Sequence, residues 1–132
     1  MNKNSGRRIE ALHYIASKLR KAKVPSLLYG SLTQGRFNES SDIDIFIIAI
    51  DMQLKTKLKI IVEILIIERL RLFFKYRVPM DVDIIENIDY LIERCSRRLE
   101  VLVPIYTNDV LEQTLKELVN RTPRCVVSWV NI

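Results

Sequence analysis

The sequence predicts an α/β fold, in the broad sense that includes α+β, with a small mixed β-sheet backed by helices. Short apolar stretches typical of strands alternate with longer stretches whose apolar residues recur at helical spacing. The chain has 132 residues, is 48% apolar and contains only three glycines. It can therefore bury a core as a single domain over residues 1–132.

The first half of the chain is predicted to supply one helix and two strands. Asn4 or Ser5 can cap a helix that ends near Lys21. Residues 26–29 form the first predicted strand and residues 43–50 the second, which is almost continuously apolar, as in a strand covered on both faces. The apolar stripe of the helix consists of Ile9, Leu12, Ile15, Ala16 and Leu19.

The middle of the chain is predicted to form a long helix, a strand and a shorter helix. Residues 54–76 contain neither glycine nor proline, and an unbroken stretch of this length favours helix over strand. Residues 80–86 form the third predicted strand. Asn87 or Asp89 can then begin a helix that runs to about Leu99.

The last third of the chain is less regular. Residues 100–106 form either a fourth strand or an irregular return, and Pro104, which lacks an N–H, makes this segment an edge strand at best. Residues 107–109 can cap a final helix, and residues 125–132 form an apolar tail after it. The apolar face of that helix is predicted to be Val110, Leu111, Leu115, Leu118 and Val119.

The net charge of the chain is +5, from 21 basic and 16 acidic residues. A basic surface suits a polyanionic partner such as a nucleotide or RNA. The alternative is an ordinary soluble surface with excess lysine. No basic run is long enough to act as a tail.

The chain carries no sign of a membrane segment. Residues 1–8 lack the apolar core of a signal peptide, and the apolar stretch 60–67 is far shorter than the roughly 20 residues that a bilayer requires. We therefore expect a cytoplasmic protein with no membrane partner. Cys95 and Cys125 form no CxxC motif, and we expect two reduced thiols rather than a disulfide or a zinc site.

The most informative pattern is Gly30-Ser31 at the end of one apolar run and Asp42-Ile43-Asp44 at the start of the next. Residues i and i+2 of a strand point to the same face, so Asp42 and Asp44 project side by side. Two adjacent carboxylates repel each other and need a compensating cation. Hard divalent metal ions bound to phosphates are the usual solution.

This pattern resembles the signature of the minimal nucleotidyltransferases, the small members of the DNA polymerase β-like nucleotidyltransferase superfamily. The resemblance covers residues 26–106, and it implies the nucleotidyltransferase (polymerase beta-like) fold. The final helix and tail, residues 107–132, match no part of the family pattern. The residues that fit the pattern are Gly30, Ser31, Gly35, Ser41, Asp42 and Asp44.

The resemblance also implies a third carboxylate on a neighbouring strand. Residues 80–85 offer two candidates on one face, Asp81 and Asp83. The sequence Val-Asp-Ile-Ile around Asp83 is similar to the third motif of the family, so we expect Asp83 to be the ligand. Asp81 is the alternative.

The resemblance implies transfer of a nucleoside monophosphate from a nucleoside triphosphate, with ATP as the expected donor, to an acceptor hydroxyl, with release of pyrophosphate. Two Mg²⁺ ions would be held by Asp42, Asp44 and Asp83, and Asp83 could also act as general base.

The nucleotide would be held by the loop that follows the first strand. Gly30 lets phosphate oxygens approach the backbone, and Ser31 offers a hydroxyl and an N–H to them. Ser41 and Arg36 are further nucleotide-binding candidates, although Arg36 could equally face solvent. The family often has a basic residue at position 34, which is Gln34 here, so one cation near the phosphates is lost.

The resemblance leaves the acceptor open among a protein side chain, an RNA 3′ end and a small molecule. Small family members often act with a helical partner protein, as in toxin–antitoxin pairs. An alternative function is therefore an antitoxin-like or nucleotide-binding subunit with little turnover that covers such a partner.

The predicted helix 54–76 is apolar around nearly its whole circumference, which exceeds the stripe needed to pack on a sheet. We expect a homodimer or a helical partner to cover the surplus, unless the C-terminal helix and tail bury it. The apolar positions are Leu58, Ile60, Ile61, Val62, Ile64, Leu65, Ile66 and Ile67, with Phe73 and Phe74 as further contact candidates.

Overall fold

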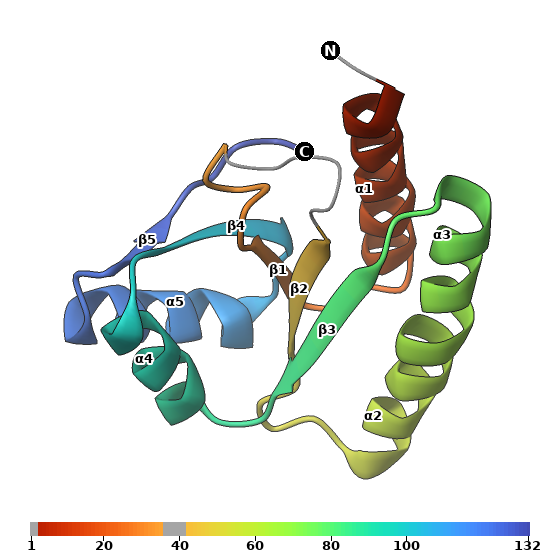
Figure 1. Ribbon diagram of the computed structural model, residues 1–132. Helices are drawn as coiled ribbons and strands as arrows, with labels where there is room; N and C mark the ends of the chain where they lie inside the picture. The colour runs from red at the N-terminus through yellow and green to blue at the C-terminus, as the bar shows by residue number, and fades with distance from the viewer. Residues whose placement is uncertain (1–2, 36–41) are drawn as a thin grey trace.

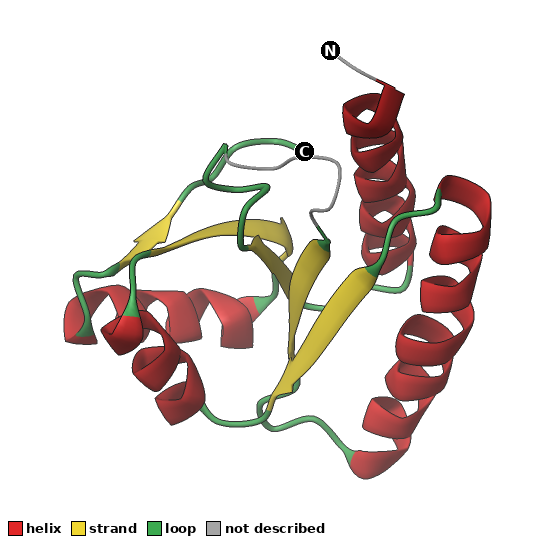
Figure 2. Ribbon diagram, in the orientation of Figure 1, coloured by secondary structure: helices red, strands yellow, loops and turns green. Residues whose placement is uncertain are grey.

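A computed structural model describes residues 3–35 and 42–132, and it shows a sheet between two layers of helices (Figure 1). Figure 2 shows the central strands in yellow and the helices that cover both faces in red. The predicted class, a small mixed sheet backed by helices, is confirmed.

The sheet has the strand order β3-β2-β1-β4-β5. β2 and β3 are parallel, β1 is antiparallel to both β2 and β4, and β4 and β5 are parallel, so the sheet is mixed. The strands are β1 (Ser26–Tyr29), β2 (Ile43–Ile48), β3 (Met80–Ile85), β4 (Glu100–Tyr106) and β5 (Cys125–Val127).

One face of the sheet packs against α1 and against the long helix formed by α2, η1 and α3. Alternate residues of β2 point into this core, because side chains of a strand alternate between faces. The bounds are α1 (Lys3–Lys21), α2 (Leu54–Ile60), η1 (Ile61–Glu68) and α3 (Arg69–Tyr76), which confirms both predicted helices.

The long helix is π-helical in its middle part, η1. Its buried residues, Ile60, Ile64, Glu68 and Leu72, follow one another at steps of four. In an α-helix of 3.6 residues per turn such a stripe drifts by roughly 40° per step. The wider π-helical turn reduces this drift, so the four side chains stay on the side that faces the core.

Glu68, the charged member of this stripe, is buried but paired. Its Oε2 accepts a hydrogen bond of 2.7 Å from the Tyr14 hydroxyl of α1, and its Oε1 lies 2.9 Å from Arg71 Nη1. A carboxylate can be buried at moderate cost when both oxygens have such partners.

The other face of the sheet is covered by α4 (Ile88–Arg97) and α5 (Asp109–Arg121). Asn87 and Asn108 cap these helices, and their side chains accept hydrogen bonds from the amides of Asp89 and Leu111. In the final helix Leu111, Leu115 and Leu118 are buried as predicted. Val110 and Val119, predicted on the same face, are exposed.

The expectation that residues 100–106 form at best an edge strand is wrong. The apolar tail supplies β5, which pairs with residues 100–102 of β4, so β4 lies between β1 and β5 in the strand order. Pro104 lies beyond that pairing, opposite Leu27 of β1, where its missing N–H leaves no unmade bond to β5.

The expectation of two reduced thiols is also wrong. Cys95 of α4 and Cys125 of β5 form a disulfide, with their Cα atoms 5.4 Å apart. Both lie in the core between α4, α5 and the sheet, and this packing joins residues 30 positions apart. No described helix is long and apolar enough to cross a membrane.

Candidate active site

The carboxylates of β2 and β3 gather on the face of the sheet that α4 and α5 cover. Asp44 is paired in register with Asp81 of β3 on one side and with Tyr29 of β1 on the other. Residues paired in a ladder project to the same face. Asp42 precedes Asp44 by two residues and shares a side-chain hydrogen bond with Asp81. The structure thus brings Asp42, Asp44 and Asp81 together.

The three carboxylates disfavour one another's charge. Burial, and next the charges of Asp81 and Asp42, raise the pKa of Asp44 to about 6. Burial, and next the charge and hydrogen bond of Asp81, raise the pKa of Asp42, while Arg8 and Arg69 act in the opposite direction. This group of acids is therefore incompletely compensated by the surrounding protein charges.

Asp83 follows Asp81 by two residues on β3, and the ladder pairs it with Phe46 rather than with Asp44. Its Oδ2 accepts a hydrogen bond of 3.3 Å from the Tyr29 hydroxyl and lies 3.5 Å from Arg94 Nη1. The Arg94 guanidinium in turn lies 5.2 Å from the centre of the Tyr29 ring. Asp83 is thus paired directly with a cation.

Gly30 lies directly beside the acids. Its φ of 83° suits glycine, and a Cβ at this position would overlap Asp44 Oδ2 and lie 3.2 Å from Asp44 Cγ. Residues 31–35 then form turns, and the Thr33 hydroxyl donates a hydrogen bond of 2.8 Å to the Gly30 carbonyl. Ser31 is partly exposed in this turn, and Gly35 has a φ of 69°. The Gly-Ser loop and the first acids therefore form one local unit.

A hollow of about 270 Å³ opens over these acids. Both acidic and basic side chains line it. The hollow can therefore bind a phosphate through its basic groups and the accompanying cation through its acidic groups. The lining residues are Tyr29, Asp44, Asp81, Val82, Asp83, Arg94 and Arg98.

The family model for nucleotidyltransferase domains matches residues 10–95. The chain belongs to this family. The match begins within α1 and ends within α4, whereas the resemblance was expected over residues 26–106. It covers about two thirds of the chain and includes Gly30, Asp42, Asp44 and Asp81. None of the curated proteins or solved structures compared with the chain matches it significantly.

Among the described residues of this nucleotidyltransferase domain, no three acidic, histidine or cysteine side chains are already arranged as a metal site. The chemistry of the acids nevertheless fits Mg²⁺, which prefers carboxylate oxygens. Burial, and next the neighbouring Asp81, raise the pKa of Asp42, so these carboxylates disfavour negative charge side by side. A divalent ion would compensate the charges of both groups.

Two predicted residues, Arg36 and Ser41, lie outside the residues that the structure describes. Three residues of the site were not predicted: Tyr29, Arg94 and Arg98. Arg94 and Arg98 are four apart at the end of a helix, and this spacing alone indicates only a shared helical face. Their relation to the acids depends on how α4 packs on the sheet, which the sequence pattern does not contain.

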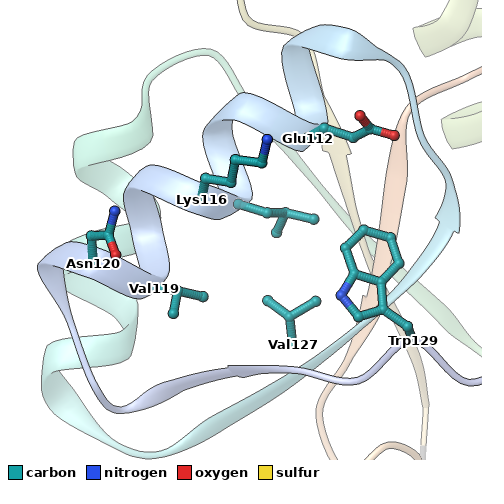
Figure 3. A pocket seen from close by; sticks show the side chains of 7 residues that line it. Glu112, Lys116, Val119, Asn120, Val127 and Trp129 are labelled. Atoms are coloured by element: carbon teal, nitrogen blue, oxygen red, sulfur yellow. The ribbon is translucent and has the colours of Figure 1, made fainter.

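A second, larger hollow of about 580 Å³ lies between α5 and the C-terminal tail (Figure 3). Leu115, Val119, Val127 and Trp129 supply apolar walls, and Glu112, Lys116 and Asn120 supply the polar groups. It has neither a carboxylate pair nor a glycine turn. The family match also ends before any of these residues.

Proposed function

We propose that this nucleotidyltransferase domain transfers a nucleoside monophosphate from ATP to an acceptor hydroxyl and releases pyrophosphate. The observation that supports this most is the placement of Gly30 against Asp44, which joins a turn that phosphate can approach to a cluster of incompletely compensated acids.

Asp42 and Asp44 would hold two Mg²⁺ ions, which supply charge neutralisation for the triphosphate and activation of the acceptor hydroxyl. As third ligand we propose Asp81 in place of Asp83, because Asp81 lies beside Asp42 and Asp44 whereas Asp83 is paired with Arg94. Asp81 would also accept the proton of the acceptor hydroxyl.

The turn after β1 would bind the triphosphate. Gly30 keeps the space beside Asp44 free of a side chain, and Ser31 would donate its hydroxyl and amide to phosphate oxygens. Ser41 and Arg36 remain predicted nucleotide-binding residues.

We further propose that the long helix binds a second copy of the chain or a helical partner, as in a toxin–antitoxin pair. The C-terminal helix does not cover it, because α5 lies on the other face of the sheet. Large apolar side chains are exposed along its length, and a continuous surface of this kind is typical of interfaces. They are Leu54, Leu58, Val62, Ile66, Ile67, Leu70, Phe73 and Phe74. Light scattering over a wide concentration range tests this association.

The decisive experiment measures pyrophosphate release from ATP with and without Mg²⁺, in parallel with ATP binding by calorimetry. Candidate acceptors are a helical partner and RNA, and mass analysis shows which of them gains AMP. Magnesium-dependent release with a labelled acceptor supports the transferase. ATP binding without release under all conditions would instead support a nucleotide-binding subunit that acts by covering its partner.

A further inference from the structure

Arg94 and Arg98 of the α4 region bring two cations to the hollow over the acids. Both line this hollow together with Asp44 and Asp81. Arg94 is positioned by its ion pair with Asp83 and by its contact with the Tyr29 ring, and its side chain is 27% exposed. A cation in this position faces any anion that the acids bind through metal.

Arg98 is held by an unusual partner. Its Nε donates a hydrogen bond of 2.9 Å to Oε1 of Glu100, whose side chain is completely buried. Within the described part of the chain, Glu100 Oε2 has no hydrogen-bond partner. The Arg98 side chain itself is 63% exposed, so a fixed, buried carboxylate orients a guanidinium that still faces the hollow.

The Gly-Ser turn contacts the residue that follows this arginine in the chain. Gln34 of the turn places its amide nitrogen 3.4 Å from the carbonyl oxygen of Leu99, between Arg98 and Glu100. The turn beside the acids thus contacts the segment that carries Arg98 and Glu100.

We propose that Arg94 and Arg98 bind the β- and γ-phosphates of the nucleoside triphosphate, with Glu100 as a positioning residue for Arg98. This proposal rests on the proposed function. The guanidinium fork offers paired donors to phosphate oxygens. Among the described residues, the hydrogen bond of Arg98 to Glu100 uses Nε, so the Nη groups can still donate to a ligand.

Arg97 provides a matched control. It is next to Arg98 in sequence, its side chain is 71% exposed and it pairs with Glu93 on the same helix. It lines a neighbouring hollow with Tyr90, Glu93, Arg94 and Arg98 but does not line the hollow over the acids. Loss of Arg97 therefore removes the same charge without removing a predicted phosphate contact.

The experiment measures calorimetric binding of the α,β-methylene analogue of ATP, which cannot release pyrophosphate, and of AMP, both with Mg²⁺. We expect Arg98→Gln and Arg94→Gln each to weaken analogue binding by about tenfold or more and AMP binding by less than about twofold. Arg97→Gln should leave both unchanged. Arg98→Lys should recover part of the loss, because it restores the charge without the fork.

Glu100→Gln tests positioning. It should weaken binding of the analogue while AMP binding stays constant, and a purely structural role would alter both ligands or the melting curve alone. Unchanged analogue binding in Arg98→Gln and Arg94→Gln, or an equal loss in Arg97→Gln, overturns the inference while the proposed function stands. Failure of the unmodified protein to bind the analogue overturns both.

Discussion

The two faces of β2 differ in what they contribute. Ile43, Ile45 and Ile47 are completely buried between the sheet, α1 and the long helix. On the opposite face Asp42 and Asp44 crowd against a third acid, and only further along the strand does this face become apolar again.

This difference separates stability from function within a single strand. Alternation along β2 allows one face to be a closed apolar core while the other holds charges that disfavour one another. The core face stabilises the strand. On the other face, binding of a cation would relieve the repulsion between the carboxylates. Substitutions on the two faces should therefore affect different measurements.

The largest expected effect is on the acidic face. Asp44→Asn should lower nucleotidyl transfer by about a thousandfold or more, because it removes a proposed metal ligand. The melting temperature should stay the same or rise, since the substitution relieves repulsion. Pyrophosphate release and differential scanning calorimetry measure the two quantities. A variant that keeps its activity would show that the acids of β2 are not the reaction centre.

The second expected effect distinguishes two acids of β3. Asp81→Asn should abolish transfer to a similar extent as Asp44→Asn. Asp83→Asn should lower it by only about tenfold, because it loosens the cation Arg94 rather than a metal ligand. The comparison uses kcat at saturating ATP and Mg²⁺ for both variants. The reverse order of effects would restore Asp83 as the third ligand.

This pair also shows how far the sequence could predict the site. Alternation indicates that both acids of β3 share a face, but which one lies level with Asp44 depends on the register between β2 and β3. Helix and loop 49–79 separate these strands, so no local pattern sets that register. The family-like motif favoured Asp83, whereas the ladder pairs Asp44 with Asp81.

The fold was more predictable than the site because its signals are local. The bounds of β1 and the caps of α4 and α5 follow from nearby residues. The disulfide between Cys95 and Cys125, and the pairing of the tail with β4, depend on distant segments that meet only in the folded chain. The sequence pattern alone therefore identified the tail as apolar but not as a strand.

On the apolar face, Ile45→Ala should lower the free energy of unfolding by about 2–5 kcal/mol, because it leaves a cavity in a completely buried site. Urea unfolding measures the change. At a temperature where the variant remains folded, we expect its affinity for magnesium and ATP to stay close to that of the unmodified protein. A large loss of affinity with little loss of stability would contradict the separation of the two faces.

The pH dependence of stability should also come from the acidic face. The pKa of Asp44 is raised from 3.8 to about 6 in the folded chain. Its stabilising contribution is therefore fully present below about pH 4 and lost as the pH rises through about 6. Without metal, the melting temperature should fall less over this range in Asp44→Asn than in the unmodified protein. Parallel profiles for the two proteins would contradict the raised pKa.

The smallest expected effect is at the turn beside the acids. Ser31→Ala should weaken binding of ATP by about 1–2 kcal/mol, since it removes one hydrogen bond to a charged oxygen and leaves the backbone amide in place. Ser17→Ala is the matched control, because Ser17 is exposed on α1, which packs on the other face of the sheet. Calorimetry with Mg²⁺ measures both affinities. Equal affinities would assign the phosphate contact of this turn to its backbone alone, because Gly30 and the amide of Ser31 are the same in both variants.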